Sequence, residues 1–290
     1  MYWQTSRYQI DLARPRVMGI VNVTPDSFSD GGQHDSTMAA LRHCEQLIRD
    51  GVDILDIGGE STRPGAPPVT LADELGRVIP VLREAVRLGV PVSLDSYKPR
   101  VMQAALDLGV DIINDIWALR WHEGGEGEQT LRATEVVAAH PSCGVCLMHM
   151  HREPQTMQVA PMQGDVLPQV RDFLAQSAQD LQALGVDKAR IMLDPGIGFG
   201  KTVAQNFALL ARQVELLQAG YPVLAGWSRK SSLAGMVPHD APPGSSLTAS
   251  ERLAPSLAAA LLAAERGASV LRVHDVKETV QALRVLEAIR

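Results

Sequence analysis

A carboxylate followed by a glycine-rich loop stands out in residues 191–201, which read IMLDPGIGFGK. The apolar residues 191–193 are too few for a helix, and Pro195 directly after Asp194 prevents a helix from continuing. The glycines allow the backbone to approach a ligand closely. A Walker A loop would need glycine where Pro195 stands, and a GxGxxG motif would need glycine at Lys201. We therefore interpret this stretch as a β-strand that ends in a binding loop of neither nucleotide type.

The same order, a short apolar run and then a polar residue, recurs along the chain. The polar residues after these runs are Asn22, Asp56, Asp95, Asn114, His149, Asp194, Lys230 and Arg272. The residues between the runs have helical periodicity, which predicts helices at residues 37–50, 70–88, 99–108, 165–184, 203–219, 250–266 and from 275 onward. Apolar runs without polar alternation are typical of parallel strands that are buried on both faces and connected by helices.

About eight such units in 290 residues favour a closed (β/α)8 barrel, the TIM barrel of the α/β class, over an open doubly wound sheet. Residues 1–290 are predicted to form a single domain, with residues 1–14 preceding the first barrel strand. The carboxyl ends of the strands would meet at one rim and gather the polar residues there. Residues 118–130 break the pattern, and we interpret them as an exposed excursion.

Composition argues against several classes of protein. A net charge of -6 and a pI near 5.8 argue against a sequence-independent nucleic-acid surface. The longest clean apolar run, residues 257–264, is shorter than the roughly 18 residues of a membrane span, and residues 1–14 carry no apolar signal segment. These features predict a cytoplasmic protein. Cys143 and Cys146 have CxxC spacing but Cys44 stands alone, so buried reduced thiols are favoured over a zinc or redox site.

The rim residues suggest two halves of a ligand. Asp194 and Asn114 can face a planar heterocycle with an amidine-like edge, because a carboxylate accepts two N–H groups and a carboxamide both donates and accepts. The loops after the last two strands of a TIM barrel are its usual phosphate site. The candidate anion-binding residues are Asn22, Arg63, Arg272 and His274. An amide oxygen such as that of Asn22, among phosphates, also suits Mg²⁺.

Six motifs carry a resemblance to a known family. They are NVTPDSFSD at residues 22–30, GGESTRPG at 58–65, LDS at 94–96, DPGIGFG at 194–200, SRKS at 228–231 and RVHD at 272–275. In this order they resemble dihydropteroate synthases, and the similarity runs from about Arg16 to the C-terminus. The resemblance implies an enzyme of folate biosynthesis that joins 6-hydroxymethyl-7,8-dihydropterin diphosphate to 4-aminobenzoate, releases diphosphate and uses Mg²⁺. It also implies a homodimer and a target of sulfonamide analogues of 4-aminobenzoate.

The same resemblance assigns roles to individual residues. The pterin would be held by Asp95, Asn114, Asp194 and Lys230, with Ile116 and Met148 as its apolar bed and Arg272 over its ring. The diphosphate would be held by Asn22, Thr62, Arg63, Arg272 and His274, with Asn22 also on Mg²⁺. The aminobenzoate would be framed by Phe28, Pro64, Phe199 and Ser231. The catalytic residues would be Asp95, Asp194, Lys230 and Arg272.

The chemistry of the rim agrees with that reaction. Diphosphate leaves readily once cations take up its developing charge, so the methylene carbon can ionise before attack. The electron-rich pterin can delocalise the resulting cation, and Asp95 and Asp194 would supply compensating negative charge. An arylamine is nucleophilic when neutral, so the site mainly has to position it and no activated protein nucleophile is required. The first two rim loops would close over the diphosphate and exclude water.

Three alternatives stay open from the residues alone. A pterin-dependent methyltransferase of the same barrel family would share the pterin contacts, although residues 61–64 and 228–230 favour diphosphate chemistry. A non-catalytic pterin-binding protein would carry the same residues. A metal-dependent hydrolase would use His149 and His151, which alternate as on one face of a strand. For the homodimer, residues 253–264 offer a face of small side chains that could equally pack against the barrel.

Overall fold

The computed structural model describes residues 1–24, 32–61, 66–123, 130–154, 156–157 and 159–289. Its centre is an eight-stranded parallel sheet with the strand order β10-β9-β6-β5-β4-β3-β12-β11. The strands are β3 (Arg16–Asn22), β4 (Ile54–Gly58), β5 (Val92–Asp95), β6 (Ile112–Asp115), β9 (Gly144–Met148), β10 (Ile191–Asp194), β11 (Leu224–Ala225) and β12 (Val270–Val273). Leu193 forms a parallel bridge with Val223, and its N–H donates to the carbonyl oxygen of Pro222 at 3.0 Å. This bridge joins the two outermost strands, so the sheet closes and the predicted TIM barrel is confirmed.

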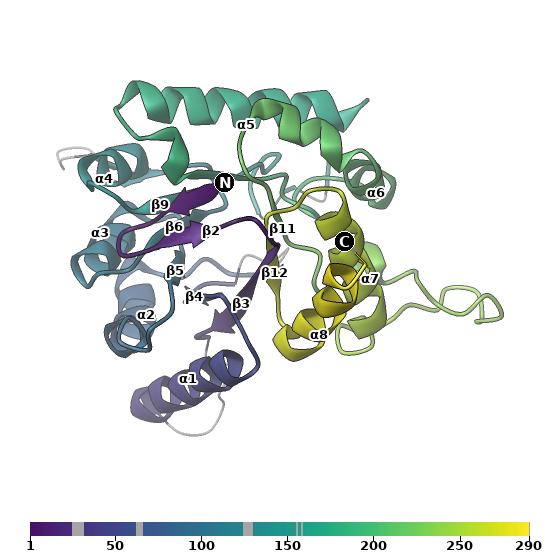
Figure 1. Ribbon diagram of the computed structural model, residues 1–290, viewed down its shortest axis with the longest axis horizontal. Helices are drawn as coiled ribbons and strands as arrows, with labels where there is room; N and C mark the ends of the chain where they lie inside the picture. The colour runs from purple at the N-terminus through teal and green to yellow at the C-terminus, as the bar shows by residue number, and fades with distance from the viewer. Residues whose placement is uncertain (25–31, 62–65, 124–129, 155, 158, 290) are drawn as a thin grey trace.

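Helices surround the barrel and connect its strands (Figure 1). They are α1 (Gly32–Arg49), α2 (Leu71–Ala85), α3 (Pro99–Asp107), α4 (Ala133–Ala139), α5 (Val166–Ala183), α6 (Val203–Ala211), α7 (Leu253–Glu265) and α8 (Val276–Glu287). Local sequence fixes several of their starts. Thr70 accepts the N–H of Asp73 at the start of α2, and Thr202 and Gln205 cap α6 reciprocally. Within the described part of the chain, no helix is long and apolar enough to cross a membrane.

The barrel interior changes from apolar to polar along its axis. Its lower layer, at the amino ends of the strands, consists of Met18, Ile54, Ile112, Cys146, Met192, Leu224 and Val270, all buried. Side chains two positions apart on a strand point to the same face, so the residues two positions after those of the lower layer form the next layer of the interior. That layer contains Asp56, Asn114, Met148, Asp194 and Arg272. The sequence therefore places an apolar floor beneath a polar rim.

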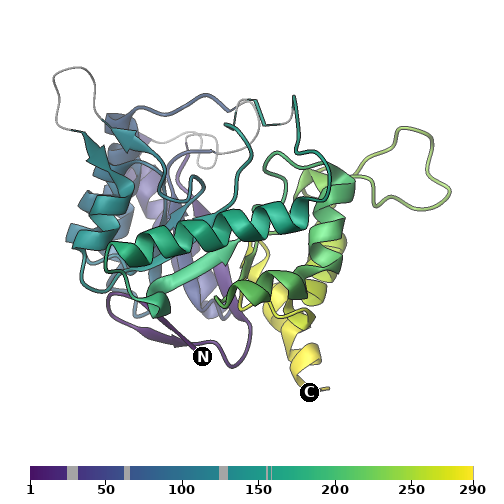
Figure 2. The ribbon, with the colours of Figure 1, turned by 90° about the horizontal axis from the view of Figure 1, so that it is seen from above.

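A short N-terminal hairpin closes the lower end of the barrel. β1 (Tyr2–Gln4) pairs antiparallel with β2 (Gln9–Asp11), and Trp3 packs against the lower layer with no exposed surface. The indole Nε1 of Trp3 donates to the carbonyl oxygen of Arg190 at 2.8 Å. Figure 2 shows this hairpin at the lower edge of the molecule. The sequence pattern predicted no strand pairing there.

The exposed excursion predicted over residues 118–130 is confirmed in part by the described residues, 118–123 and 130. Arg120, Trp121, His122 and Thr130 are exposed. Ala118 and Leu119 are 5% and 3% exposed, and β7 (His122–Glu123) pairs antiparallel with β8 (Leu131–Arg132). The carboxylate of Asp115 accepts the N–H groups of Trp117 and Leu119 at 2.8 and 2.7 Å. These two bonds fold the backbone into a buried turn, which explains why the prediction of exposure was wrong for Ala118 and Leu119.

Two helical stretches also differ from the prediction. The helix predicted over residues 203–219 ends as an α-helix at Ala211 and continues as the 3₁₀ segment η3 (Gln213–Ala219). Helix α4 was not predicted, because its seven residues are too short to show a helical period. Neither difference changes which residues reach the rim, since both lie on the connections between strands.

The three cysteines are buried and form no disulfide, which confirms the prediction of buried thiols. Burial raises the pKa of Cys44 to about 12. Burial also raises the pKa of Cys143, although Arg190 opposes this by donating to its Sγ from Nη2 at 3.2 Å. Thiols held protonated in this way are poor nucleophiles and poor metal ligands.

Candidate active site

An arginine that bridges two carboxylates forms the centre of the rim. Arg272, in β12, donates from Nε to Oδ2 of Asp56 at 2.6 Å and from Nη2 to Oδ2 of Asp95 at 2.5 Å. The Nδ2 of Asn114 donates to Oδ2 of Asp56 at 3.3 Å. Strand pairing sets Asp56 opposite Ser93 and Asp95 opposite Asn114. Adjacent parallel strands therefore present these polar groups as one continuous surface.

Burial controls the charge of this surface. It raises the pKa of Asp95 to about 7, an effect that Arg272 opposes and the nearby charge of Asp56 adds to. Burial alone would lower the pKa of Arg272, but its two carboxylate partners raise it above the ordinary value. Two carboxylates thus share one guanidinium, and the surface favours ligand groups that donate N–H bonds or carry positive charge.

Asp194 faces the same rim from the end of β10. Its Oδ1 accepts the N–H of Gly196 at 2.7 Å, and Gly196 adopts a left-handed φ of 67°. Burial raises the pKa of Asp194, while the Gly196 bond and the charges of Lys230 and Arg272 oppose the shift. Among the described residues, the N–H of Gly196 is the one hydrogen-bond donor to the Asp194 carboxylate. The carboxylate is therefore held in place through one oxygen, and the other oxygen can accept from a ligand.

An apolar cluster lies among these polar groups. It consists of Ile116, Met148, Met150, Met157 and Phe199, all buried, with Tyr97 and Trp117 packed against it. Met148 ends β9 one layer above Cys146. The Nζ of Lys230 lies 4.3 Å from the centroid of the Phe199 ring, a cation–π contact. A flat heterocycle has an apolar bed here beside the Asp194 carboxylate.

A histidine held by a serine follows the last strand, β12. The Oγ of Ser228 accepts the backbone N–H of His274 at 3.1 Å and lies 3.0 Å from Nδ1 of the same residue. The serine hydroxyl has one proton and two lone pairs, so it can donate to Nδ1 or accept from it while it accepts the backbone N–H, and in either case it holds the ring in place. Asn22 ends β3, which pairs with β12. Two of the candidate anion-binding side chains, Asn22 and His274, thus lie at the ends of neighbouring strands.

A buried lysine ties the second rim loop to the barrel, and the sequence reasoning missed it. Lys98 pairs with Glu60 and, at 2.5 Å, with Glu74, and the Tyr97 hydroxyl donates to Glu60 at 3.2 Å. The second oxygen of Glu74 is buried without a partner among the described residues. Glu74 looked like an ordinary acidic residue in the first turn of α2, so its type and position gave no signal of this cluster.

The structure describes most of the predicted site residues. Those that lie at the rim are Asn22, Asp95, Asn114, Ile116, Met148, Asp194, Phe199, Lys230, Arg272 and His274. Ser231 is exposed and begins the 3₁₀ segment η4 (Ser231–Leu233). Four predicted residues lie outside the described ones: Phe28, Thr62, Arg63 and Pro64. Asp56 was expected at the rim but given no ligand, although it contacts both Arg272 and Asn114; its position at a strand end was the available signal.

His149 does not face the rim with the other strand-end residues, so that expectation was wrong. It follows Met148, and strand alternation directs it to the outside of the barrel. Its ring packs edge-on against Phe173 of α5, with centroids 5.0 Å apart, and its Nδ1 lies 2.9 Å from Nζ of Lys201. Within the described residues, no three His, Cys, Asp or Glu side chains gather as a possible metal site. The hydrolase alternative therefore has no ligand set in this part of the chain.

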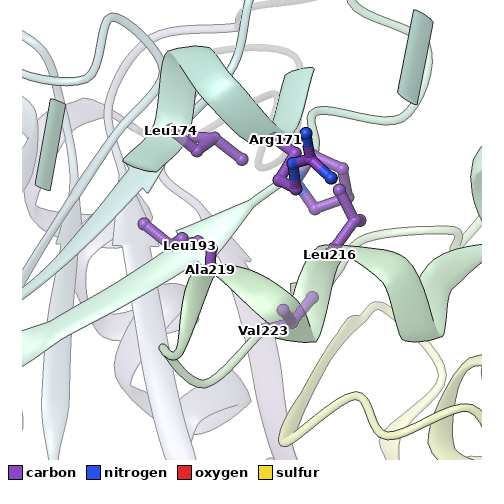
Figure 3. Close-up of a pocket in the computed structure, with 7 residues that line it drawn as sticks. Arg171, Leu174, Leu193, Leu216, Ala219 and Val223 are labelled. Carbon is purple, nitrogen blue, oxygen red and sulfur yellow. The ribbon is translucent and has the colours of Figure 1, made fainter. Parts of the chain in front are cut away.

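A small crevice outside β10 is separate from the rim (Figure 3). It is lined by Arg171, Leu174, Leu193, Pro195, Leu216, Ala219 and Val223. Leu193 points into it, whereas the next residue, Asp194, points into the barrel. Apart from Arg171 its lining side chains are aliphatic, so we interpret the crevice as a packing gap between α5 and η3.

Comparisons with known proteins agree with the geometry of the rim. The sequence family described as pterin binding enzyme matches residues 18–274. A dihydropteroate synthase from Neisseria meningitidis serogroup B is 46% identical, over 99% of this chain and 97% of the relative. This chain belongs to the dihydropteroate synthase family. The resemblance predicted from the six motifs is therefore confirmed, and so is the prediction of a transferase.

Solved dihydropteroate synthases share the whole fold. The enzyme from Xanthomonas albilineans with 4-aminobenzoic acid has a TM-score of 0.86 and 44% identity, covering 100% of this chain and 98% of that one. The enzyme from Burkholderia cenocepacia, complexed with 7,8-dihydropteroate, has a TM-score of 0.83 and 49% identity, covering 100% and 96%. A dihydropteroate synthase barrel is thus present from end to end of the chain.

Proposed function

We propose that the rim of this barrel joins 6-hydroxymethyl-7,8-dihydropterin diphosphate to 4-aminobenzoate and releases diphosphate, forming 7,8-dihydropteroate for folate biosynthesis. One observation carries the proposal. Arg272 bridges Asp56 and Asp95 beside Asn114, and Asp194 ends the strand across the barrel. This arrangement suits a flat ring with several N–H donors. The ligands named for the solved relatives, 4-aminobenzoic acid and 7,8-dihydropteroate, support the same reaction.

The pterin would bind through its aminopyrimidine edge. The Asp194 carboxylate would accept two N–H groups of that edge, and Asn114 would donate to a ring nitrogen or oxygen and accept from another. The ring faces would meet Ile116 and Met148 on one side and Arg272 on the other. Because two carboxylates hold the guanidinium of Arg272, it would be oriented before the substrate arrives.

The diphosphate would bind at the ends of β3 and β12. The protein groups are Asn22, Arg272 and His274, with Thr62 and Arg63 assigned from the family motif. The amide oxygen of Asn22 fits Mg²⁺, which takes few protein ligands and keeps waters and substrate phosphate oxygens in its octahedron. Bound Mg²⁺ would neutralise charge on the leaving diphosphate. Ser228 would hold the His274 ring with Nε2 toward the diphosphate, and in the tautomer with its proton on Nε2 the ring would donate to a phosphate oxygen.

The reaction needs little covalent chemistry from the protein. The bond between the pterin methylene carbon and the diphosphate oxygen breaks, and its electron pair leaves with diphosphate. Asp95 and Asp194 would stabilise the cation that the pterin ring delocalises, and Lys230 would hold the ring on the opposite side. The neutral arylamine nitrogen then bonds to the methylene carbon and releases a proton. The amine would be framed by Phe199 and Ser231, with Phe28 and Pro64 from the family motif.

Diphosphate release tests the proposal directly. The chain would be incubated with the pterin diphosphate and Mg²⁺, with and without 4-aminobenzoate, and both diphosphate and dihydropteroate would be measured. Equal amounts of the two products, dependent on 4-aminobenzoate, are expected. Pterin binding without any diphosphate release would sink the synthase assignment and favour the methyltransferase or the non-catalytic binder. Sulfonamides should compete with 4-aminobenzoate in the same assay.

We also propose that the chain is a homodimer of the cytoplasm. Leu262 in α7 and Val285 in α8 are 40% and 67% exposed, and the two helices pack side by side, so an apolar face is available for a second copy. Three unpaired cysteines suit a reducing compartment. Light scattering should give twice the chain mass, and Leu262→Glu should give a monomer. A monomeric wild-type chain at micromolar concentration would contradict the dimer, and cell fractionation would test the location.

A further inference from the structure

Lys201 and His149 are polar residues that the proposed reaction does not use, and they meet behind the loop that follows β10. Lys201 is 2% exposed. Its Nζ lies 2.9 Å from the carbonyl oxygen of Gly196, 3.1 Å from that of Phe199 and 3.3 Å from that of His149. The Nδ1 of His149 lies 2.9 Å away. Lys201 is thus enclosed by the loop that it terminates and by the residue after β9.

The partners of Lys201 determine its charge state. Three are carbonyl oxygens, which only accept, and an ammonium has three N–H groups for the four atoms around it, so the long contact to the His149 carbonyl at 3.3 Å shares an N–H with another partner. Facing an ammonium, the Nδ1 of His149 can only accept one of these N–H groups. Burial together with the charge of Lys201 lowers the pKa of His149 to about 2, which keeps the ring neutral. Burial lowers the pKa of Lys201 to about 7, although the charge of Asp194 opposes the shift. Among the described residues, no carboxylate forms an ion pair with Lys201.

The loop is packed too closely against its neighbours to adopt this shape without glycine. Gly196 and Gly200 have φ of 67° and 72°, and a Cβ at these positions would lie 1.9 Å from the carbonyl oxygen of His149 and 2.6 Å from Cβ of His151. Such positions exclude other residues. Lys201 holds two loop carbonyls turned inward, while the N–H of Gly196 bonds to Asp194 on the other side.

The contacts of Lys201 therefore reach both candidate substrate positions. Gly196 connects the ammonium to Asp194, whose carboxylate faces the pterin site. Phe199 connects it to the aminobenzoate site, where Lys230 covers the ring. Among the residues that the structure describes, no contact of Lys201 leads to Asn22 or His274, which belong to the diphosphate side of the barrel.

We propose that Lys201 is a positioning residue, an internal ammonium that fixes the β10 loop in the shape that presents Asp194 to the pterin and Phe199 to the aminobenzoate. His149 completes the cage as a neutral acceptor. This inference rests on the proposed function, since it uses the substrates assigned there. The N–H groups of Lys201 point at the carbonyl oxygens of its own loop and not at the rim.

Lys201→Met tests the proposal, because it keeps the length of the side chain and removes every N–H donor. We expect kcat/KM to fall about 10²-fold, the loss typical of a misplacement near 1 Å. Calorimetry should show weaker binding of the pterin without diphosphate, and the KM for 4-aminobenzoate should rise. Binding of Mg²⁺-diphosphate should stay within twofold of wild type. The matched control is Lys188→Met, which removes an ammonium that lies over the Tyr221 ring, far from the loop, and should change none of these values.

A second variant keeps the test decisive if Lys201→Met folds poorly. Lys201→Ala leaves a space shaped like propylammonium, so added propylammonium should restore pterin affinity and turnover, whereas 1-propanol should not. Wild-type values in Lys201→Met would overturn the proposal. So would equal losses of pterin and diphosphate affinity without rescue by propylammonium, because that result indicates general destabilisation. Pterin binding is measured without turnover, so a wild-type chain that lacks synthase activity would refute the proposed function and still leave the role of Lys201 to be decided.

Discussion

Replacing Asp194 by asparagine isolates the recognition of the pterin edge. Oδ1 of Asp194 accepts the N–H of Gly196 at 2.7 Å, and a carboxamide oxygen can keep that bond, so the side chain should stay in place. The other oxygen becomes an NH₂ group that faces a donor of the pterin. One ring N–H then loses its acceptor, at a cost of about 1–3 kcal/mol. At about 1.4 kcal/mol for each tenfold change, kcat/KM for the pterin diphosphate should fall about 5-fold to about 150-fold.

The assay is steady-state turnover with the pterin diphosphate varied at saturating 4-aminobenzoate, together with calorimetry of pterin binding. Both measurements should show the loss, whereas the KM for 4-aminobenzoate should change little. Asp187→Asn is the matched control, since Asp187 caps a 3₁₀ turn by accepting the N–H of Ala189 and asparagine caps equally well. Unchanged kcat/KM in Asp194→Asn would refute the assignment of Asp194 to the pterin edge.

Three further outcomes are expected. Excess chelator should abolish turnover and Asn22→Ala should raise the Mg²⁺ concentration required; full turnover in chelator would contradict the metal assignment. Burial raises the pKa of Asp95 to about 7, so its ionised form is lost as pH falls and kcat/KM should decline below about pH 7. Asp95→Asn should have lower activity, and its pH–rate profile should lack this decline. Trp3→Ala should lower the free energy of unfolding, measured in urea, by about 3–5 kcal/mol, while kcat/KM of the folded enzyme stays near the wild-type value. A large loss of kcat/KM would mean that packing of the lower layer also determines where the rim side chains lie.

The convergence of strand-end residues was predictable from the sequence. Short apolar runs without alternation indicate buried parallel strands, and such strands end at one rim of a closed barrel. Hydrogen bonds accordingly join Arg272 to Asp56 and Asp95, and Asn114 to Asp56. His149 shows the limit of this reasoning. One residue of difference at a strand end reverses the direction of a side chain, and the end of β9 could not be fixed that closely from apolarity alone.

Contacts between residues that are distant along the chain could not be predicted from the sequence. Arg272 and Asp56 are 216 positions apart, and their contact depends on the register of three strands. The cage around Lys201 depends on carbonyl groups, which every residue carries and which therefore leave no mark in the sequence. The hairpin of β1 and β2 has three residues in each strand, too few to show alternation.

The two layers of the barrel interior divide stability from function. Buried charges rarely stabilise a fold as well as packed apolar side chains of similar size, so Asp56, Asp95 and Asp194 make the upper layer less stable than the floor beneath it. Arg272 and Lys230 offset these carboxylates only in part, since burial still raises the pKa of Asp95 and Asp194. A flat ligand that donates N–H groups to these carboxylates would supply the hydrogen bonds that the protein alone does not provide. Selection for binding therefore accounts for charges at positions where valine or leucine would give a more stable barrel.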